Sequence, residues 1–82
     1  METVEIIKQV NEIFKSVLES DDIEINNETT SDDIEEWDSL NHIILVVEIE
    51  KHFGIKFTAN EIVSFKNVGE MCDAIKQKKV LI

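Results

Sequence analysis

The sequence has no proline, only two glycines and one cysteine among its 82 residues. A single cysteine cannot form an internal disulfide, so no covalent cross-link within the chain is expected. With so few residues that interrupt a helix, the chain is expected to form helices joined by polar loops. Its longest apolar run, residues 43–47, is far shorter than the roughly 20 residues that a membrane-spanning helix needs.

Basic side chains are also scarce. Eight lysine and arginine residues stand against 18 aspartate and glutamate residues, which gives a formal net charge of −10. Such a charge repels nucleic acid and anionic membranes, and it favours protein partners with basic surfaces. Hydrophobic residues make up 43% of the sequence, which is enough for one core, so we expect a single monomeric domain over residues 1–82.

The first residues give no sign of export. Met1 leads directly into acidic, amphipathic sequence without the apolar segment of a signal peptide. We therefore expect a cytoplasmic protein.

Hydrophobic periodicity predicts a long helix at the N-terminal end and another in the middle of the chain. The first covers residues 4–18, and the second runs from Asp38 or Ser39 to Phe53, with Gly54 in the left-handed position that follows a helix end. The buried stripe of the first helix is expected to contain Val4, Ile7, Val10, Phe14, Val17 and Leu18, with Ile6 and Ile13 widening it.

Capping signals predict two further helices. Thr58 and Glu61 have the spacing of a capping box, which favours a short helix over residues 59–64. Asn67 and Glu70 have similar spacing and begin a last helix that ends near residue 79 and is followed by a short apolar tail. Its buried stripe is expected to contain Val68, Met71, Cys72 and Ile75. Cys72 is therefore expected to act as a small core residue and not as a nucleophile.

A long polar segment, residues 20–36, separates the first two helices. We expect an ordered loop held to the core by Ile23, Ile25 and Ile34, and loops of this length inside compact domains tend to be functional. The predicted fold is therefore all-α: a small up-and-down bundle of three long helices with a short third helix.

The acidic residues of this loop approach the spacing of a calcium-binding loop. The oxygen-bearing side chains are Asp22, Glu24, Asn26, Glu28 and Thr30 at alternating positions, followed by Asp33. However, Asn27 stands where the sharp turn needs glycine, and Asp33 stands where a bidentate glutamate is expected. We predict no specific metal site, although loose binding of divalent cations remains an alternative.

The second helix carries more apolar residues than one buried face requires. At 100° per residue, one face gathers Leu45, Val46, Ile49 and Phe53 with His42, and the opposite face gathers Leu40, Ile43, Ile44 and Val47. We expect the second face to be exposed and rimmed by the acidic residues Asp38, Glu48 and Glu50. Exposed apolar patches with polar rims mark partner surfaces, so these residues form a predicted docking site; the alternative is that neighbouring helices cover both faces.

Ser39 lies at the start of this helix, where the positive end of the helix dipole favours an attached phosphate. The simpler interpretation is that Ser39 only caps the helix. Trp37 is expected to pack against the helix start and to hold the preceding loop.

The sequence resembles the acyl carrier protein family over essentially its whole length. The matching segments are Asp38-Ser39-Leu40, the apolar helix that ends with His52-Phe53-Gly54-Ile55, and Asn67-Val68-Gly69-Glu70. The resemblance implies a small four-helix acyl-carrier bundle in which Ser39 carries a 4′-phosphopantetheine arm derived from coenzyme A. It further implies a non-catalytic carrier of thioester-bound acyl groups, with a phosphopantetheinyl transferase and acyl-loading and acyl-transfer enzymes as partners.

The sequence departs from typical fatty-acid carriers just before the serine, where Glu36-Trp37 replaces the usual Gly-Ala. This form looks more like stand-alone carriers of polyketide, aminoacyl or surface-polysaccharide pathways. Two alternatives stay open: an aminoacyl or peptidyl carrier of a specialised pathway, and an acidic helical adaptor that is not pantetheinylated.

Overall fold

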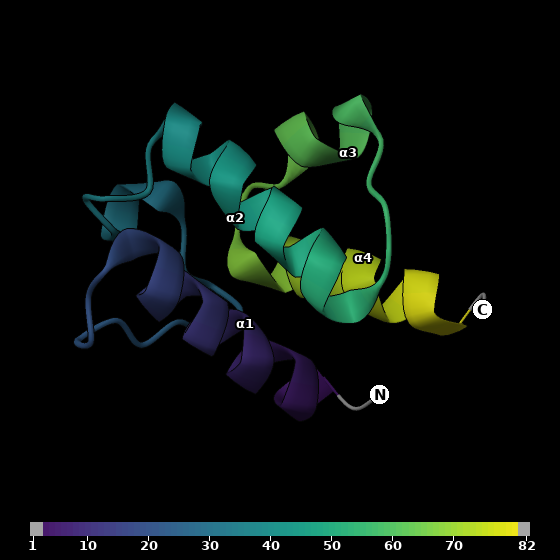
Figure 1. Cartoon of the computed structure of the whole chain (residues 1–82), viewed down its shortest axis with the longest axis horizontal. Helices are drawn as coiled ribbons and strands as arrows, with labels where there is room; N and C mark the ends of the chain where they lie inside the picture. Colours follow the sequence, from purple (N-terminus) through teal and green to yellow (C-terminus); the bar gives the residue numbers. More distant parts are fainter. Residues whose placement is uncertain (1–2, 81–82) are drawn as a thin grey trace.

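The computed structural model describes residues 3–80, which contain four α-helices, one 3-10 turn and no strand (Figure 1). In chain order the elements are α1 (Thr3–Leu18), η1 (Ser31–Asp33), α2 (Ser39–Phe53), α3 (Ala59–Ser64) and α4 (Val68–Val80). The four predicted helices are confirmed to within one residue at each end. The turn η1 inside the long loop was not predicted. Of the predicted apolar tail, Val80 belongs to α4, and the last two residues lie outside the described part.

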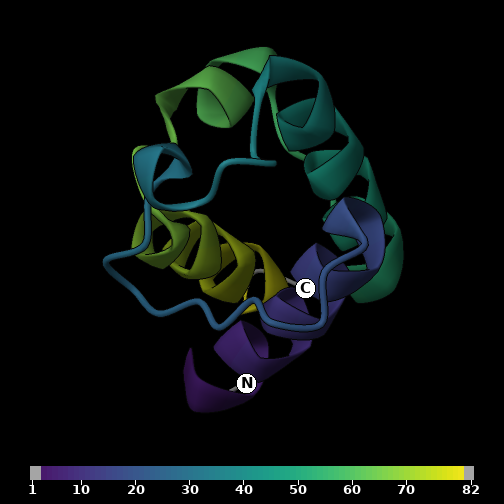
Figure 2. The ribbon, with the colours of Figure 1, turned by 90° about the vertical axis from the view of Figure 1, so that its left-hand side faces the viewer.

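α1 packs against both α2 and α4, and the three long helices surround one core (Figures 1 and 2). In Figure 1, α2 and α4 run in the same direction and α1 runs opposite to both. The bundle therefore does not alternate strictly up and down, because the segment 54–67 with α3 carries the chain back before α4 begins. This return segment brings α3 beside the first turns of α2 (Figure 2).

The core-facing row of α1 is spaced at four residues and contains Ile6, Val10, Phe14 and Leu18, which are all buried. The prediction that Val4 belongs to the buried stripe is wrong, because this residue is 72% exposed. A row at four-residue spacing drifts only slowly around a helix, so it can meet α2 and α4 along its whole length. Ile7, Ile13 and Val17 flank this row and are half-buried.

The other predicted core stripes are confirmed. On α2 the buried residues are Leu45, Val46, Ile49 and Phe53, and on α4 they are Val68, Met71, Cys72 and Ile75.

Asp38, and not Ser39, caps the N-terminus of α2. The Asp38 Oδ1 atom accepts a hydrogen bond from the Asn41 backbone N–H at 2.8 Å, and Ser39 is the first helical residue. At the other end Gly54 adopts φ 68°, and the Ile55 N–H donates to the Glu50 carbonyl oxygen at 3.1 Å, as expected for a Schellman-type end. Because aspartate supplies the cap, the Ser39 hydroxyl is not needed to hold the helix end.

The long loop is fastened to the start of α4. The backbone N–H groups of Val68 and Gly69 donate to the carbonyl oxygens of Thr29 and Asn27, each at 2.9 Å. A Cβ atom at position 69 would lie 2.8 Å from the Asn27 carbonyl oxygen, so the close approach requires glycine. Buried Thr29 and Ile23 complete the attachment, which makes the loop an ordered part of the domain.

Candidate functional site

Ser39 lies exposed at the first turn of α2, next to the end of the long loop. Among the described residues, no hydrogen bond engages its hydroxyl group. Its neighbour Asp38 accepts the Asn41 backbone N–H, and the Asn41 side chain donates to the Glu36 carbonyl oxygen in the loop. Its position at the positive end of a 15-residue helix favours an anionic group on the hydroxyl oxygen. The residues present therefore fit a covalently attached phosphodiester.

Trp37 and His42 form a polar bridge from the loop to α3. The Trp37 indole N–H donates to His42 Nδ1 at 3.0 Å, and His42 Nε2 lies 2.9 Å from the carbonyl oxygen of Ile62. Because the indole can only donate, Nδ1 must be the acceptor, so Nε2 carries the proton and donates to the Ile62 carbonyl. Both ring nitrogens of His42 are thus occupied, and His42 is not available as a base for Ser39, one turn away.

Trp37 itself is buried, as predicted. Its ring meets Phe14 of α1 edge-on, with centroids 5.0 Å apart, and it stacks on His42 with centroids 5.9 Å apart. One side chain therefore links the loop, α1 and the start of α2, and so fixes the place at which Ser39 emerges.

An open hollow of about 540 Å³ lies beside Ser39, between the first turns of α2, the turn η1 and α3. Its lining combines apolar and charged side chains: Ser31, Asp32, Trp37, Asp38, Ser39, His42, Ile43, Ile62, Val63, Phe65 and Lys66. The sequence did not predict this hollow, because its lining residues come from three separate segments that meet only in the folded chain.

The exposed apolar face predicted for α2 is present. Leu40 and Ile43 are 70% and 51% exposed, and Ile44 and Val47 are each 40% exposed. α3 adds Val63, which is 81% exposed and which no sequence pattern had assigned to this face. A helix of six residues has too few turns for a periodic pattern, so the sequence could not decide which of its apolar residues faces outward.

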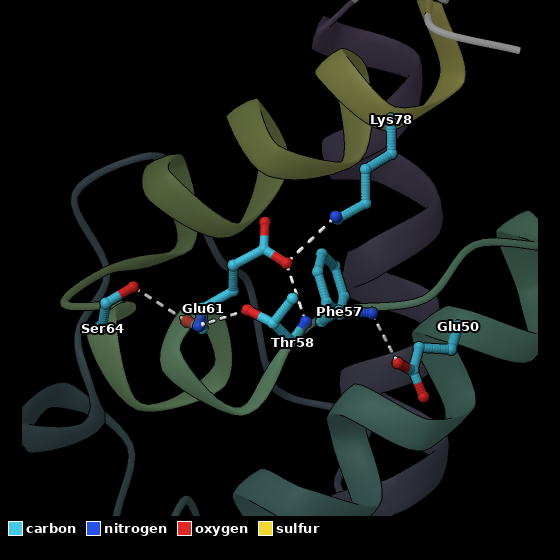
Figure 3. A network of polar contacts seen from close by, with 6 residues as sticks. All are labelled: Glu50, Phe57, Thr58, Glu61, Ser64 and Lys78. Carbon is cyan, nitrogen blue, oxygen red and sulfur yellow. Dashed lines mark hydrogen bonds and ion pairs between the residues drawn. The ribbon is translucent and has the colours of Figure 1, made fainter.

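The three acidic residues expected around this face differ in their surroundings. Asp38 caps α2, and Glu48 is exposed and pairs with Lys51 at 3.8 Å. Glu50 is half-buried, and its Oε2 atom accepts the Phe57 backbone N–H at 2.7 Å (Figure 3). Glu50 thus helps to hold the α2–α3 connection, which the sequence did not reveal.

A network around Glu61 holds α3 against α4 (Figure 3). Its Oε1 atom accepts the Thr58 backbone N–H at 2.8 Å and lies 3.0 Å from Lys78 Nζ, while the Glu61 N–H donates to Thr58 Oγ1 at 3.2 Å. The ammonium of Lys78 also lies 5.6 Å from the centre of the Phe57 ring. This is the predicted capping box, extended by an ion pair to another helix.

The hydrogen bond from Thr58, with help from Lys78, lowers the pKa of Glu61 below its usual value of 4.5. A carboxylate whose pKa is lower in the folded than in the unfolded state stabilises the fold above its unfolded pKa, and this contribution is lost as the pH falls through the folded value. We therefore expect Glu61→Gln to lose stability near neutral pH and to show a smaller further loss than wild type on acidification below pH 4.5. Urea unfolding at a series of pH values checks this, and equal acid sensitivity of both proteins would contradict it.

The other candidate residues have structural roles. Cys72 is buried, and burial, followed by the charge of Asp73, raises the pKa of its thiol to about 11, which makes it a poor nucleophile at neutral pH. In the loop, Asn26 Oδ1 accepts the Glu28 N–H, and Asp33 Oδ2 accepts the Thr30 N–H. These oxygens are used within the loop, and among residues 3–80 no group of three or more His, Cys, Asp or Glu side chains has a metal-binding arrangement.

Comparisons with known proteins agree with this geometry. A family model described as the phosphopantetheine attachment site matches residues 8–75. Among solved structures, the solution NMR structure of a holo acyl carrier protein from Geobacter metallireducens matches with a TM-score of 0.85 and 38% sequence identity, over 90% of this chain and 85% of that one. No curated protein matches the sequence.

The chain therefore belongs to the acyl carrier protein family, as its sequence suggested. It is a carrier protein, with 4′-phosphopantetheine as its covalent cofactor, and it presents acyl intermediates on that arm. Within residues 3–80, no helix has the length and apolar character needed to cross a bilayer.

Proposed function

We propose that Ser39 is the residue that carries the phosphopantetheine arm. The observation that supports this is the exposed hydroxyl at the positive end of α2, which is free because Asp38 supplies the helix cap. Ser31 also borders the hollow, but it belongs to the short turn η1, which offers no comparable helix dipole. The arm then starts beside the hollow and the exposed apolar face.

Attachment requires a partner enzyme. The Ser39 oxygen attacks the phosphorus of coenzyme A that bears the pantetheine, forming an O–P bond. The bond from that phosphorus to the bridging oxygen breaks, and adenosine 3′,5′-bisphosphate leaves. Because both nitrogens of His42 are engaged, the base that accepts the hydroxyl proton belongs to the phosphopantetheinyl transferase.

Once attached, the arm makes the domain a portable substrate holder. Its thiol binds the acyl group as a thioester, which remains a good acyl donor. A flexible tether also raises the effective concentration of the cargo at the active site of a docked enzyme. We propose that partner enzymes perform the acyl chemistry and that this domain supplies only position and recognition.

Incubation with coenzyme A and a broad-specificity phosphopantetheinyl transferase tests the proposal. We expect a mass increase equal to one arm, and peptide mapping should locate it on Ser39. Modification of another residue, or no mass increase with several transferases, would overturn the assignment.

We further propose that partners dock on the exposed face of α2, with Leu40, Ile43, Ile44 and Val47 as apolar contacts and Asp38 and Glu48 as charged contacts. Glu50 belongs to the same predicted set, but it also holds the Phe57 N–H, so its replacement would disturb the fold as well. Val63 extends the apolar face onto α3. Partners with basic surfaces suit this face and the net charge of −10.

Charge reversal and truncation should affect different rate constants of docking. Glu48→Lys is expected to slow association with the transferase and to weaken its salt dependence, because peripheral charges act mainly on encounter. Val47→Ala is expected to raise the dissociation rate roughly fivefold with little change in salt dependence, as for a loss of about 1 kcal/mol of contact. Surface plasmon resonance at several salt concentrations separates the two effects.

The chain offers matched controls on α1. Glu12 pairs with Lys15 at 3.9 Å in the same i,i+3 geometry as Glu48 with Lys51 at 3.8 Å, and Val4 is an exposed valine. Glu12→Lys and Val4→Ala should therefore leave docking nearly unchanged. Equal effects of the α1 and α2 substitutions would show that the face of α2 is not the docking surface.

A further inference from the structure

Lys66 is the one cation among the side chains that line the hollow beside Ser39. It lies in the connection between α3 and α4, 27 residues beyond Ser39 in the sequence, so only the folded chain brings the two together. In a domain with a net charge of −10, a lysine at this place is a specific feature of the hollow and not part of a general basic surface.

The charges around the hollow are distributed unevenly. Asp32 and Asp38 contribute carboxylates from the loop and the start of α2, while Lys66 contributes an ammonium from the side of α3 and α4. A phosphodiester on Ser39, which lines the same hollow, adds a negative charge to it. It is repelled by the carboxylates and attracted by the lysine, so Coulomb forces direct it toward the α3 side.

The ammonium of Lys66 is available for this role. The ion pairs among the described residues are Lys15–Glu12, Lys51–Glu48 and Lys78–Glu61, and none of them includes Lys66. The neighbouring Glu70 carboxylate accepts the backbone N–H of Lys66 at 3.2 Å, and within residues 3–80 it forms no ion pair with the Lys66 ammonium. A lysine acts on phosphate as a point charge on a flexible stem, so its pairing needs no fixed geometry.

We propose that Lys66 binds the phosphodiester at the base of the arm and so directs the arm along the hollow toward α3. This rests on the proposed attachment at Ser39. Lys66 is a positioning residue, because it acts on the direction of the arm and not on the thiol or the acyl group. Since the side chain is exposed, the contact is partial and sensitive to salt.

Phosphorus-31 NMR of the purified holo protein tests the proposal. The phosphodiester resonance of Lys66→Gln should be shifted from that of wild type, and Lys66→Arg should keep the wild-type position. Lys56→Gln removes the same charge from an exposed lysine that does not line the hollow, and it should leave the resonance unchanged. Raising the salt from about 0.1 M to 1 M, which shortens the Debye length from roughly 10 Å to 3 Å, should move the wild-type resonance toward that of Lys66→Gln.

Intact mass, measured first, separates the two hypotheses. If Ser39 gains the arm but the phosphorus resonance is the same in wild type, Lys66→Gln and Lys56→Gln, the role of Lys66 is overturned and the attachment site stands. An equal shift in both glutamine variants would also overturn it, since it would reflect net charge alone. If no arm is gained at Ser39, both proposals fail.

Discussion

Ser39→Ala is expected to abolish attachment of the phosphopantetheine arm completely, because no other group can replace the nucleophilic oxygen at this position. The mass of the variant should stay unchanged after incubation with coenzyme A and transferase, under conditions that modify wild type fully. Thioester loading, which depends on the arm, should be lost with it.

The structure also predicts that this variant stays folded. Asp38 caps α2, so the substitution removes no helix cap, and alanine is a good helix former at the first helical position. We expect a change in stability within about 0.5 kcal/mol, checked by urea unfolding. Ser31→Ala is the matched control, since it removes a hydroxyl from the same hollow and should leave attachment intact. Full modification of Ser39→Ala would place the arm elsewhere.

Trp37→Ala is expected to have the largest effect on stability near the site. It removes the edge-on contact with Phe14, leaves His42 Nδ1 without its donor and opens space under the start of α2. Loss of a buried tryptophan side chain costs about 3–5 kcal/mol. A domain of this size has a total free energy of unfolding of roughly 4–12 kcal/mol, so the substitution should remove a large part of it. Urea unfolding followed by circular dichroism measures this without the tryptophan signal.

Trp37→Phe separates packing from hydrogen bonding. It keeps an aromatic ring near Phe14 but removes the N–H that holds His42. We expect a loss of about 1 kcal/mol from the unsatisfied acceptor, together with faster amide exchange in α3, because His42 is the link to the Ile62 carbonyl. A Trp37→Ala variant that loses less than about 1 kcal/mol would contradict the central role of this side chain.

Sequence and structure agree best where the information is local. The ends of α2 and α3 follow from Gly54 and from the Thr58–Glu61 capping box, and each signal lies within a few residues of the turn that it defines. The exposed and buried faces of α2 also follow from its own periodicity, because both faces repeat over four turns. Short or irregular segments carry less predictive pattern. The turn η1 was not predicted, and no periodicity indicated that Val63 faces outward.

The differences at Val4 and Glu50 depend on segments outside the helix to which each residue belongs. Val4 fits a helical stripe, yet it is exposed, because the four-residue row from Ile6 is the one that meets the other long helices. Glu50 fits an acidic rim, yet its carboxylate is bound to the Phe57 N–H. In both cases the packing of other segments against the helix decided the outcome, and the pattern within the helix did not.

The sequence by itself determined the four helices, the faces of α2 and the position of Ser39 at a helix start, because these depend on spacing within single segments. Only the tertiary structure decided what surrounds Ser39. The bridge from Trp37 through His42 to the Ile62 carbonyl, and the hollow shared with Lys66, join segments 20 or more residues apart. Such contacts depend on how the return segment 54–67 packs beside α2, and no spacing within one helix encodes that.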